Sequence, residues 1–205
     1  MNSDEIAEIL ASHALWVSSG ETSGECADFQ GADLWGADLR GADLRGADFQ
    51  SADLENVNLR GANLRDANLK ATQFRWADLT GANLTDTDFA GADFRDADLR
   101  WANLENANLH DAYLGGANLQ DAYLGGTNLE GANLEGANLR SADLRGANLK
   151  GANFKGADLR GANLKGVNLR DADLRDTNLR DTNLRGVDLK GANLRDADLR
   201  GAVLD

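Results

Sequence analysis

The side chains that could do chemistry in this 205-residue chain are few in kind. There is one cysteine, Cys26, and there are two histidines, His13 and His110, which lie far apart in sequence. A single cysteine cannot form an internal disulfide, and two scattered histidines do not make a zinc-ligand cluster. The serines have no His and Asp partners nearby in sequence, and there is no glycine-rich phosphate loop. The sequence therefore predicts no metal, no cofactor and no nucleophilic catalyst.

Carboxylates are the most abundant ionisable groups, with Asp+Glu 34 against Lys+Arg 21 and a formal net charge of -13. Most of the aspartates recur at one position of a five-residue unit, where we expect them to point outward into water. Catalytic carboxylates usually have a pKa that is shifted by burial or by neighbouring charges, and carboxylates in water would not be tuned in this way. We therefore expect a protein that is not an enzyme.

The five-residue unit determines where each side chain points. From Phe29 to Leu204 every fifth residue is Leu or Phe, which gives 36 consecutive units without an insertion. Two residues before this central residue stands Ala in 28 units, and between the two stands Asp in 15 units and Asn in 17. Residues two apart in an extended strand face the same side. The central and Ala positions therefore form the core, and the Asp or Asn between them points outward.

A turn must follow each of these short strands, because five is an odd number and a continuous strand would carry every second Leu into water. The residue three before each centre is Gly, Asp, Asn or Ser in nearly every unit, and these residues tolerate tight turns. An α-helix is excluded, because five residues advance about 500° around a helix and leave no apolar stripe. The pattern predicts an all-β solenoid. A four-sided, 20-residue coil would place the six phenylalanines in two interior columns, with Phe29, Phe49 and Phe89 in one and Phe74, Phe94 and Phe154 in the other.

Units such as ADLRG, ANLRD and ANFKG resemble the A(D/N)LXX repeats of the pentapeptide-repeat family over residues 26 to 205. This resemblance implies a right-handed quadrilateral parallel β-helix with four units per coil, so that the repeats make about nine coils. At about 4.8 Å between neighbouring strands the rod is expected to be roughly 43 Å long. We expect residues 26–205 to form a single β-helix domain.

Residues 1–25 precede the repeat and predict a short α-helix followed by a connection. Asn2 or Ser3 can cap this helix, Gly20 can end it, and apolar residues recur within it at three- and four-residue steps. We expect it to cap the first coil, although a separate targeting or binding helix would show the same pattern. At the other end Val203 replaces the usual Asp or Asn, and we expect a homodimer whose contact face includes Val203 and Leu204.

Composition limits the compartment and the partner. No apolar run approaches the roughly 20 residues of a membrane-spanning helix, and residues 1–20 lack a secretory signal, so we expect a cytoplasmic protein with no membrane partner. The negative net charge disfavours naked nucleic acid as a partner and favours a basic one. The charge is uneven, however. Residues 26–135 carry 8 basic and 19 acidic side chains, whereas residues 136–205 carry 13 and 10.

Outward-pointing residues are the candidates for contact with a protein partner. The large aromatic candidates are Trp35, Trp76, Trp101, Tyr113 and Tyr123, which either contact a partner, as aromatic hot-spot residues do, or pack on neighbouring coils. A 20-residue coil would also stack Arg140, Arg160, Arg180 and Arg200 in one column, where Asp158 and Asp198 could offset part of the repulsion. Two interpretations of this column stay open: a solvated, roughly compensated surface, and a site for an acidic partner.

The sequence thus predicts a non-enzymatic rod that acts as a protein-binding or scaffolding module with an unknown partner. The resemblance implies an alternative, because some pentapeptide-repeat proteins are acidic mimics of duplex DNA that bind DNA gyrase and can protect it from quinolones. Duplex DNA carries one charge per about 1.7 Å, so a rod segment of roughly 26 Å, the length of residues 26–135, would need about 16 negative charges. The segment has a net charge of only -11. Gyrase-binding members also tend to have a C-terminal dimerisation helix and many Phe centres, which this chain lacks.

Overall fold

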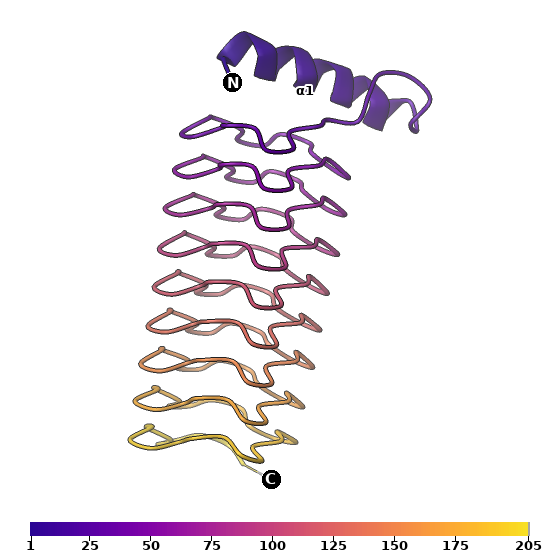
Figure 1. The fold of residues 1–205 in the computed structure, drawn as a ribbon. Coiled ribbons are helices and arrows are strands. Elements are labelled where there is room, and N and C mark those ends of the chain that lie inside the picture. Colours follow the sequence, from indigo (N-terminus) through magenta and orange to yellow (C-terminus); the bar gives the residue numbers. More distant parts are fainter. Residues whose placement is uncertain (205) are drawn as a thin grey trace.

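The computed structural model describes residues 1–204, which form one helix and a stack of coils (Figure 1). Helix α1 spans Ser3–Ser18 and lies across the end of the stack that begins the repeats. The rest of the chain winds around one axis toward the C-terminus at the opposite end (Figure 1). No helix within residues 1–204 is long and apolar enough to cross a membrane.

Parallel pairing with a period of 20 residues joins the coils. The outward residue of each unit bridges the residue 20 positions later, from Asp28–Asp48 to Asn183–Val203, and every pair is parallel. Four five-residue units therefore make one coil, and the predicted right-handed quadrilateral β-helix is confirmed. The four sides of the coil form four faces of the rod. We name them by their bridging residues, one every 20 positions: face A from Asp28 to Asp188, face B from Asp33 to Asn193, face C from Asp38 to Asp198 and face D from Asp43 to Val203.

Backbone hydrogen bonds run along the rod in both directions from each short strand. The N–H of Leu59 donates to the carbonyl of Asp78 in the next coil at 2.7 Å, and the N–H of Asn58 donates to the carbonyl of Ala37 in the previous coil at 2.9 Å. Each coil is thus bonded to the coils on either side of it, as in a parallel sheet.

Almost every corner is a tight turn closed by one hydrogen bond. In the turn from Leu59 to Ala62, the N–H of Ala62 donates to the carbonyl of Leu59 at 3.0 Å, and Gly61 has a φ of 63°. A positive φ at the third residue is typical of a type II turn and favours Gly or Asn. The corresponding residue has a positive φ at every corner from Gly31 to Gly201. The predicted corner position, three residues before each centre, is confirmed.

The interior is filled by the Leu, Phe and Ala columns, which are buried over most of the rod. The rings of Phe29 and Phe49 stack at 4.9 Å, and those of Phe74 and Phe94 stack at 4.7 Å, one coil apart in each case. The predicted arrangement in two columns is therefore confirmed. Stacked aromatic pairs add about 0.5–1.5 kcal/mol to the stabilisation from burial alone.

Helix α1 has a specific signal at each end. The side chain of Asn2 accepts the N–H of Glu5 at 2.9 Å, and the carboxylate of Glu5 accepts the N–H of Asn2 at 2.9 Å, which is a capping box. After the helix, Gly20 has a φ of 68°, and the N–H of Glu21 donates to the carbonyl of Trp16 at 2.8 Å. This Schellman-type ending explains why the helix ends where Gly20 predicts.

The apolar side of α1 rests on the first coil. Ile6, Ile9 and Leu10 pack against the core, and His13 is completely buried. The Nδ1 atom of His13 accepts the N–H of Ala27 at 3.0 Å, at the start of the first strand. The helix therefore covers the apolar end of the rod, as a capping helix should.

Candidate protein-contact surface

Charged side chains on the outside of the rod follow a local rule. Wherever the outward Asp is followed two residues later by Arg, the guanidinium folds back onto that carboxylate. In Asp38–Arg40 the Nε–Oδ1 distance is 2.8 Å and the Nη2–Oδ2 distance is 2.6 Å. We call this arrangement a fork, and bidentate pairs of this kind are among the stronger ion pairs. Forks form at Arg40, Arg45, Arg95, Arg100, Arg145, Arg160, Arg175 and Arg200.

The forks change how their carboxylates titrate. The hydrogen bonds from Arg45 hold the pKa of Asp43 below its usual value, and those from Arg200 lower the pKa of Asp198 to about 2. The expectation that outward carboxylates are untuned is therefore wrong at these positions, because a guanidinium two residues away stabilises the ionised form. A lowered pKa keeps the carboxylate charged at neutral pH, which is the opposite of what a general acid needs.

Asp and Asn at the outward position accept the same backbone hydrogen bond but differ in charge. The Oδ1 atom of the outward residue accepts the N–H two residues later in both cases, as in Asp158–Arg160 and Asn138–Arg140, each at 3.2 Å. Asn138 also donates from Nδ2 to Oδ1 of Asn118 in the previous coil at 2.9 Å. These roles were not predicted from the residue types, although the near-exclusive use of two residues that share the Oδ1 acceptor was a signal for them.

Cations that follow an Asn and form an ion pair mostly use carboxylates in neighbouring coils, whereas Arg195 pairs with the adjacent Asp196. Lys150 on face A pairs with Glu130 at 3.2 Å, and Lys155 on face B pairs with Glu135 at 3.5 Å. Within residues 1–204, the lysines and arginines that form no ion pair are Arg75, Arg140, Lys165, Arg180, Arg185 and Lys190. Four of these six lie on faces C and D of neighbouring coils.

The predicted arginine column lies on face C. Its four members follow bridging residues that stack directly, and they are Arg140, Arg160, Arg180 and Arg200. Asp158 holds Arg160 and Asp198 holds Arg200, at 2.5 and 2.6 Å, so the predicted compensation is present in alternate coils. The hydrogen bond from Arg160 is the main cause of the lowered pKa of Asp158, and the charge of Arg140 adds to it. The use of this column by a partner stays a prediction.

The predicted aromatic residues are all exposed but do not form one patch. Trp76 and Trp101 occupy adjacent corners, whereas Tyr113 is on face B and Tyr123 on the opposite face D. The guanidinium of Arg75 lies 4.3 Å from the ring centroid of Trp76, so one side of that indole is covered. Their role as contacts stays a prediction, and their exposed fractions are 64% for Trp35, 48% for Trp76, 52% for Trp101, 51% for Tyr113 and 52% for Tyr123.

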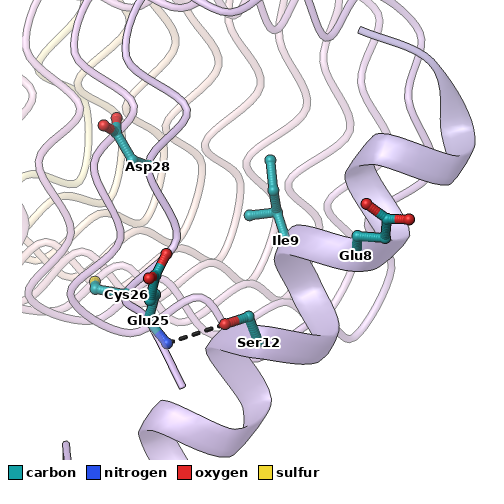
Figure 2. A pocket seen from close by; sticks show the side chains of 6 residues that line it. All are labelled: Glu8, Ile9, Ser12, Glu25, Cys26 and Asp28. Carbon is teal, nitrogen blue, oxygen red and sulfur yellow. Dashed lines mark hydrogen bonds between the residues drawn. The ribbon is translucent and has the colours of Figure 1, made fainter. Parts of the chain in front are cut away.

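A shallow pocket lies where α1 meets the first coil (Figure 2). Ser12 accepts the N–H of Glu25 there at 3.0 Å, and the thiol of Cys26 donates to the carbonyl of Gly46 at 3.4 Å. Burial raises the pKa of Cys26, which makes the thiol less nucleophilic at neutral pH. No group of three or more His, Cys, Asp or Glu side chains within residues 1–204 could hold a metal ion.

The last described coil has exposed apolar side chains. Leu199 is 39% exposed, Val203 41% and Leu204 58%, whereas Leu184 in the preceding coil is only 4% exposed. Val203 bridges Asn183, so the short strand is complete at this position. A homodimer through Val203 and Leu204 stays a prediction.

The protein is a parallel β-helical repeat protein, because it has four-sided coils, type II corners and outward ladders of stacked Asp and Asn. The chain belongs to the family of pentapeptide repeats, whose model matches residues 25–61, 51–86, 72–111, 107–146, 137–176 and 168–205. No curated protein sequence matches it.

Solved structures of two proteins are similar to this chain. HetL, a pentapeptide repeat protein involved in heterocyst differentiation regulation from the cyanobacterium Nostoc sp. strain PCC 7120, is 34% identical over 100% of this chain and 97% of HetL, with a TM-score of 0.46. A trypsin-treated variant of QnrB1, a plasmid-mediated fluoroquinolone resistance protein, is 24% identical over 88% of this chain and 86% of QnrB1, with a TM-score of 0.63. The likeness to QnrB1 concerns the fold alone.

Proposed function

We propose that this protein is a non-enzymatic binding or scaffolding module of the cytoplasm, which presents the faces of a rigid rod to a protein partner. The observation that carries this proposal is that the outward side chains are held in position. Forks hold the charged groups, and hydrogen bonds between stacked Asn side chains hold the polar groups. A surface that is already ordered loses less side-chain entropy when a partner binds. The lowered pKa of the fork aspartates and the raised pKa of Cys26 support a role without catalysis.

Affinity capture with a surface-altered control tests this function. The native protein and a variant with Trp76→Ala and Trp101→Ala would be immobilised and exposed to a lysate, and each retained protein would then be purified and its direct affinity measured. We expect at least one retained protein to bind directly with a stable stoichiometry. If no retained protein binds directly, or if the isolated rod turns over a substrate, the proposal is wrong.

DNA mimicry toward gyrase is a second candidate function, which one observation favours. The carboxylates of the first two coils on faces A and B form no ion pair within residues 1–204; they are Asp28, Asp33, Asp48, Asp53 and Glu55. QnrB1, which has the same fold, is a fluoroquinolone resistance protein. Forks at Arg40 and Arg45 on faces C and D of the first coil, and at Arg95 and Arg100 further along, reduce the negative potential of this half of the rod, which favours the first proposal.

A gyrase supercoiling assay separates the two candidates. Inhibition at low micromolar protein that is lost in an Asp53→Asn, Glu55→Gln variant would establish the mimic. No inhibition at tens of micromolar would exclude it and leave the protein-binding rod.

A further inference from the structure

Of the four exposed cations on faces C and D that form no ion pair within residues 1–204, three follow one another along one edge of the rod. Arg140 and Arg180 are on face C, and Lys165 is on face D in the coil between them. We call these three residues the cationic edge. Elsewhere in the C-terminal half the cations of faces A and B are mostly paired, as with Lys150 and Glu130. The unpaired charge is therefore concentrated on one side of the rod.

The choice of Asn in three units leaves these cations free. Asn138, Asn163 and Asn178 each accept the N–H two residues later at 3.2 Å, just as Asp does in other units. In the same column Asp158 closes a fork on Arg160 with an Nε–Oδ1 distance of 2.9 Å. The fold thus accepts Asp at such a position, and Asn preserves the turn while it leaves the guanidinium donors available.

The aspartates around the cationic edge limit what can bind there. Asp143, Asp158 and Asp198 lie on faces C and D and are each held by their own arginine, and Asp181 lies at the corner between the two faces. Duplex DNA carries one charge per about 1.7 Å and would place phosphates over these carboxylates as well as over the free cations. A ligand with widely spaced negative charges can meet the cations and avoid the aspartates.

The spacing of the cations fits carboxylates on a helix. Arg140 and Arg180 are two coils apart, which is about 9.6 Å along the rod at 4.8 Å per coil. Residues seven apart on an α-helix are separated by about 10.5 Å and lie on the same side. Arginine forks bind carboxylates in a bidentate manner, and the native forks show this geometry on the same face.

We propose that the cationic edge binds an acidic helical segment of a partner protein, with carboxylates about two turns apart. This inference rests on the proposed protein-binding function and names the chemistry of the segment that is recognised. Arg160 forms a fork with Asp158 of its own chain. Arg140 and Arg180 form the equivalent fork with a carboxylate of the partner.

The test occupies the guanidinium groups of Arg140 and Arg180 without removing either arginine. The variant Asn138→Asp, Asn178→Asp gives Arg140 and Arg180 their own carboxylates and keeps the turn acceptor. The control variant Asn58→Asp, Asn63→Asp makes the same change before Arg60 and Arg65, which already pair with Asp78 and Asp86. The probe is a labelled helical peptide with two glutamates seven residues apart, and a second peptide has glutamines instead. Binding is measured by fluorescence anisotropy at low ionic strength.

We expect the glutamate peptide to bind native protein and the control variant about equally, and the Asn138→Asp, Asn178→Asp variant about tenfold more weakly. The glutamine peptide should also bind at least tenfold more weakly. Equal binding to all three proteins, or no binding to the native protein, would overturn the inference and leave the protein-binding rod to be tested by affinity capture. Tighter binding of a duplex DNA probe that is lost in the same variant would overturn it in favour of nucleic acid.

Discussion

Replacement of Gly136 by Ala should destabilise the rod by about 1 kcal/mol through the backbone alone. Gly136 occupies a corner with a φ of 68°, and no heavy atom lies within 4 Å of the place where a Cβ would be. An L-residue in this left-handed region costs about 1–2 kcal/mol. Alanine also restricts the unfolded chain, which returns about 0.4–1 kcal/mol. The difference between these two effects is the expected loss in the free energy of unfolding.

Two neighbouring glycines provide matched variants. Gly116 is the same corner one coil earlier, with a φ of 70°, but a Cβ there would lie 2.5 Å from Oδ1 of Asp96. Gly116→Ala should therefore cost more than Gly136→Ala, because the Asp96 side chain must rotate. Gly115 precedes that corner, and a Cβ there would meet its nearest atoms at 3.7 and 3.9 Å, which is ordinary contact. Gly115→Ala should be neutral or should stabilise the rod by about 0.4–1 kcal/mol.

Urea denaturation followed by circular dichroism measures these differences. The midpoints are compared at an unchanged m-value, because a changed m would mean that only part of the rod unfolds in the transition. The expected order of stability is Gly115→Ala, then Gly136→Ala, then Gly116→Ala. If Gly115→Ala lowers the midpoint as much as Gly136→Ala, the positive φ of the corner does not control the effect and the reasoning fails.

Three further outcomes follow from the core, the forks and the cap. Phe74→Ala should lower the free energy of unfolding by about 3–5 kcal/mol, whereas Phe74→Leu should lower it far less because Leu is the usual residue in that column. A similar loss for both variants in urea denaturation would contradict the packing argument. The fork aspartates have a lowered pKa, so their contribution to the free energy of unfolding is fully present above pH 3.8. For Asp198 this contribution is lost as the pH falls through about 2. The urea midpoint should drop across this range, and the drop should be smaller in the Asp198→Asn variant. Burial lowers the pKa of His13, so the stability of the α1 cap is fully present above pH 6.5 and is lost as the pH falls through the lowered value. Protonated His13 can no longer accept the N–H of Ala27, so the amides of Ser3–Ser18 should exchange hydrogen faster at about pH 5 than at about pH 7 after correction for intrinsic rates, and unchanged protection would refute the role of His13.

Much of the candidate surface could be placed from the sequence. A period of five with a 20-residue coil assigns Arg140 and Arg180 to one column, Trp76 and Trp101 to adjacent corners, and the structure agrees. The forks could not be inferred from residue types alone, because Asp and Arg two residues apart form one only when both side chains leave the same side of a short strand and the turn brings them together. Once that geometry is seen, the sequence pattern Asp-Leu-Arg or Asp-Phe-Arg identifies every fork.

The sequence by itself determined the period, the core columns and the corners of this protein. Burial of Leu at every fifth residue requires a turn in each unit, and Gly, Asp and Asn are the residues that accept the positive φ of that turn. Only the tertiary structure decided which charges are neutralised. Arg60 meets Asp78 at 3.6 Å and Lys150 meets Glu130 at 3.2 Å because closure of a 20-residue coil brings together side chains that are 18 and 20 positions apart. Arg140, Lys165 and Arg180 form no ion pair within residues 1–204, because Asn stands at the outward position of their units and the stacked Asp158 and Asp198 are held by Arg160 and Arg200.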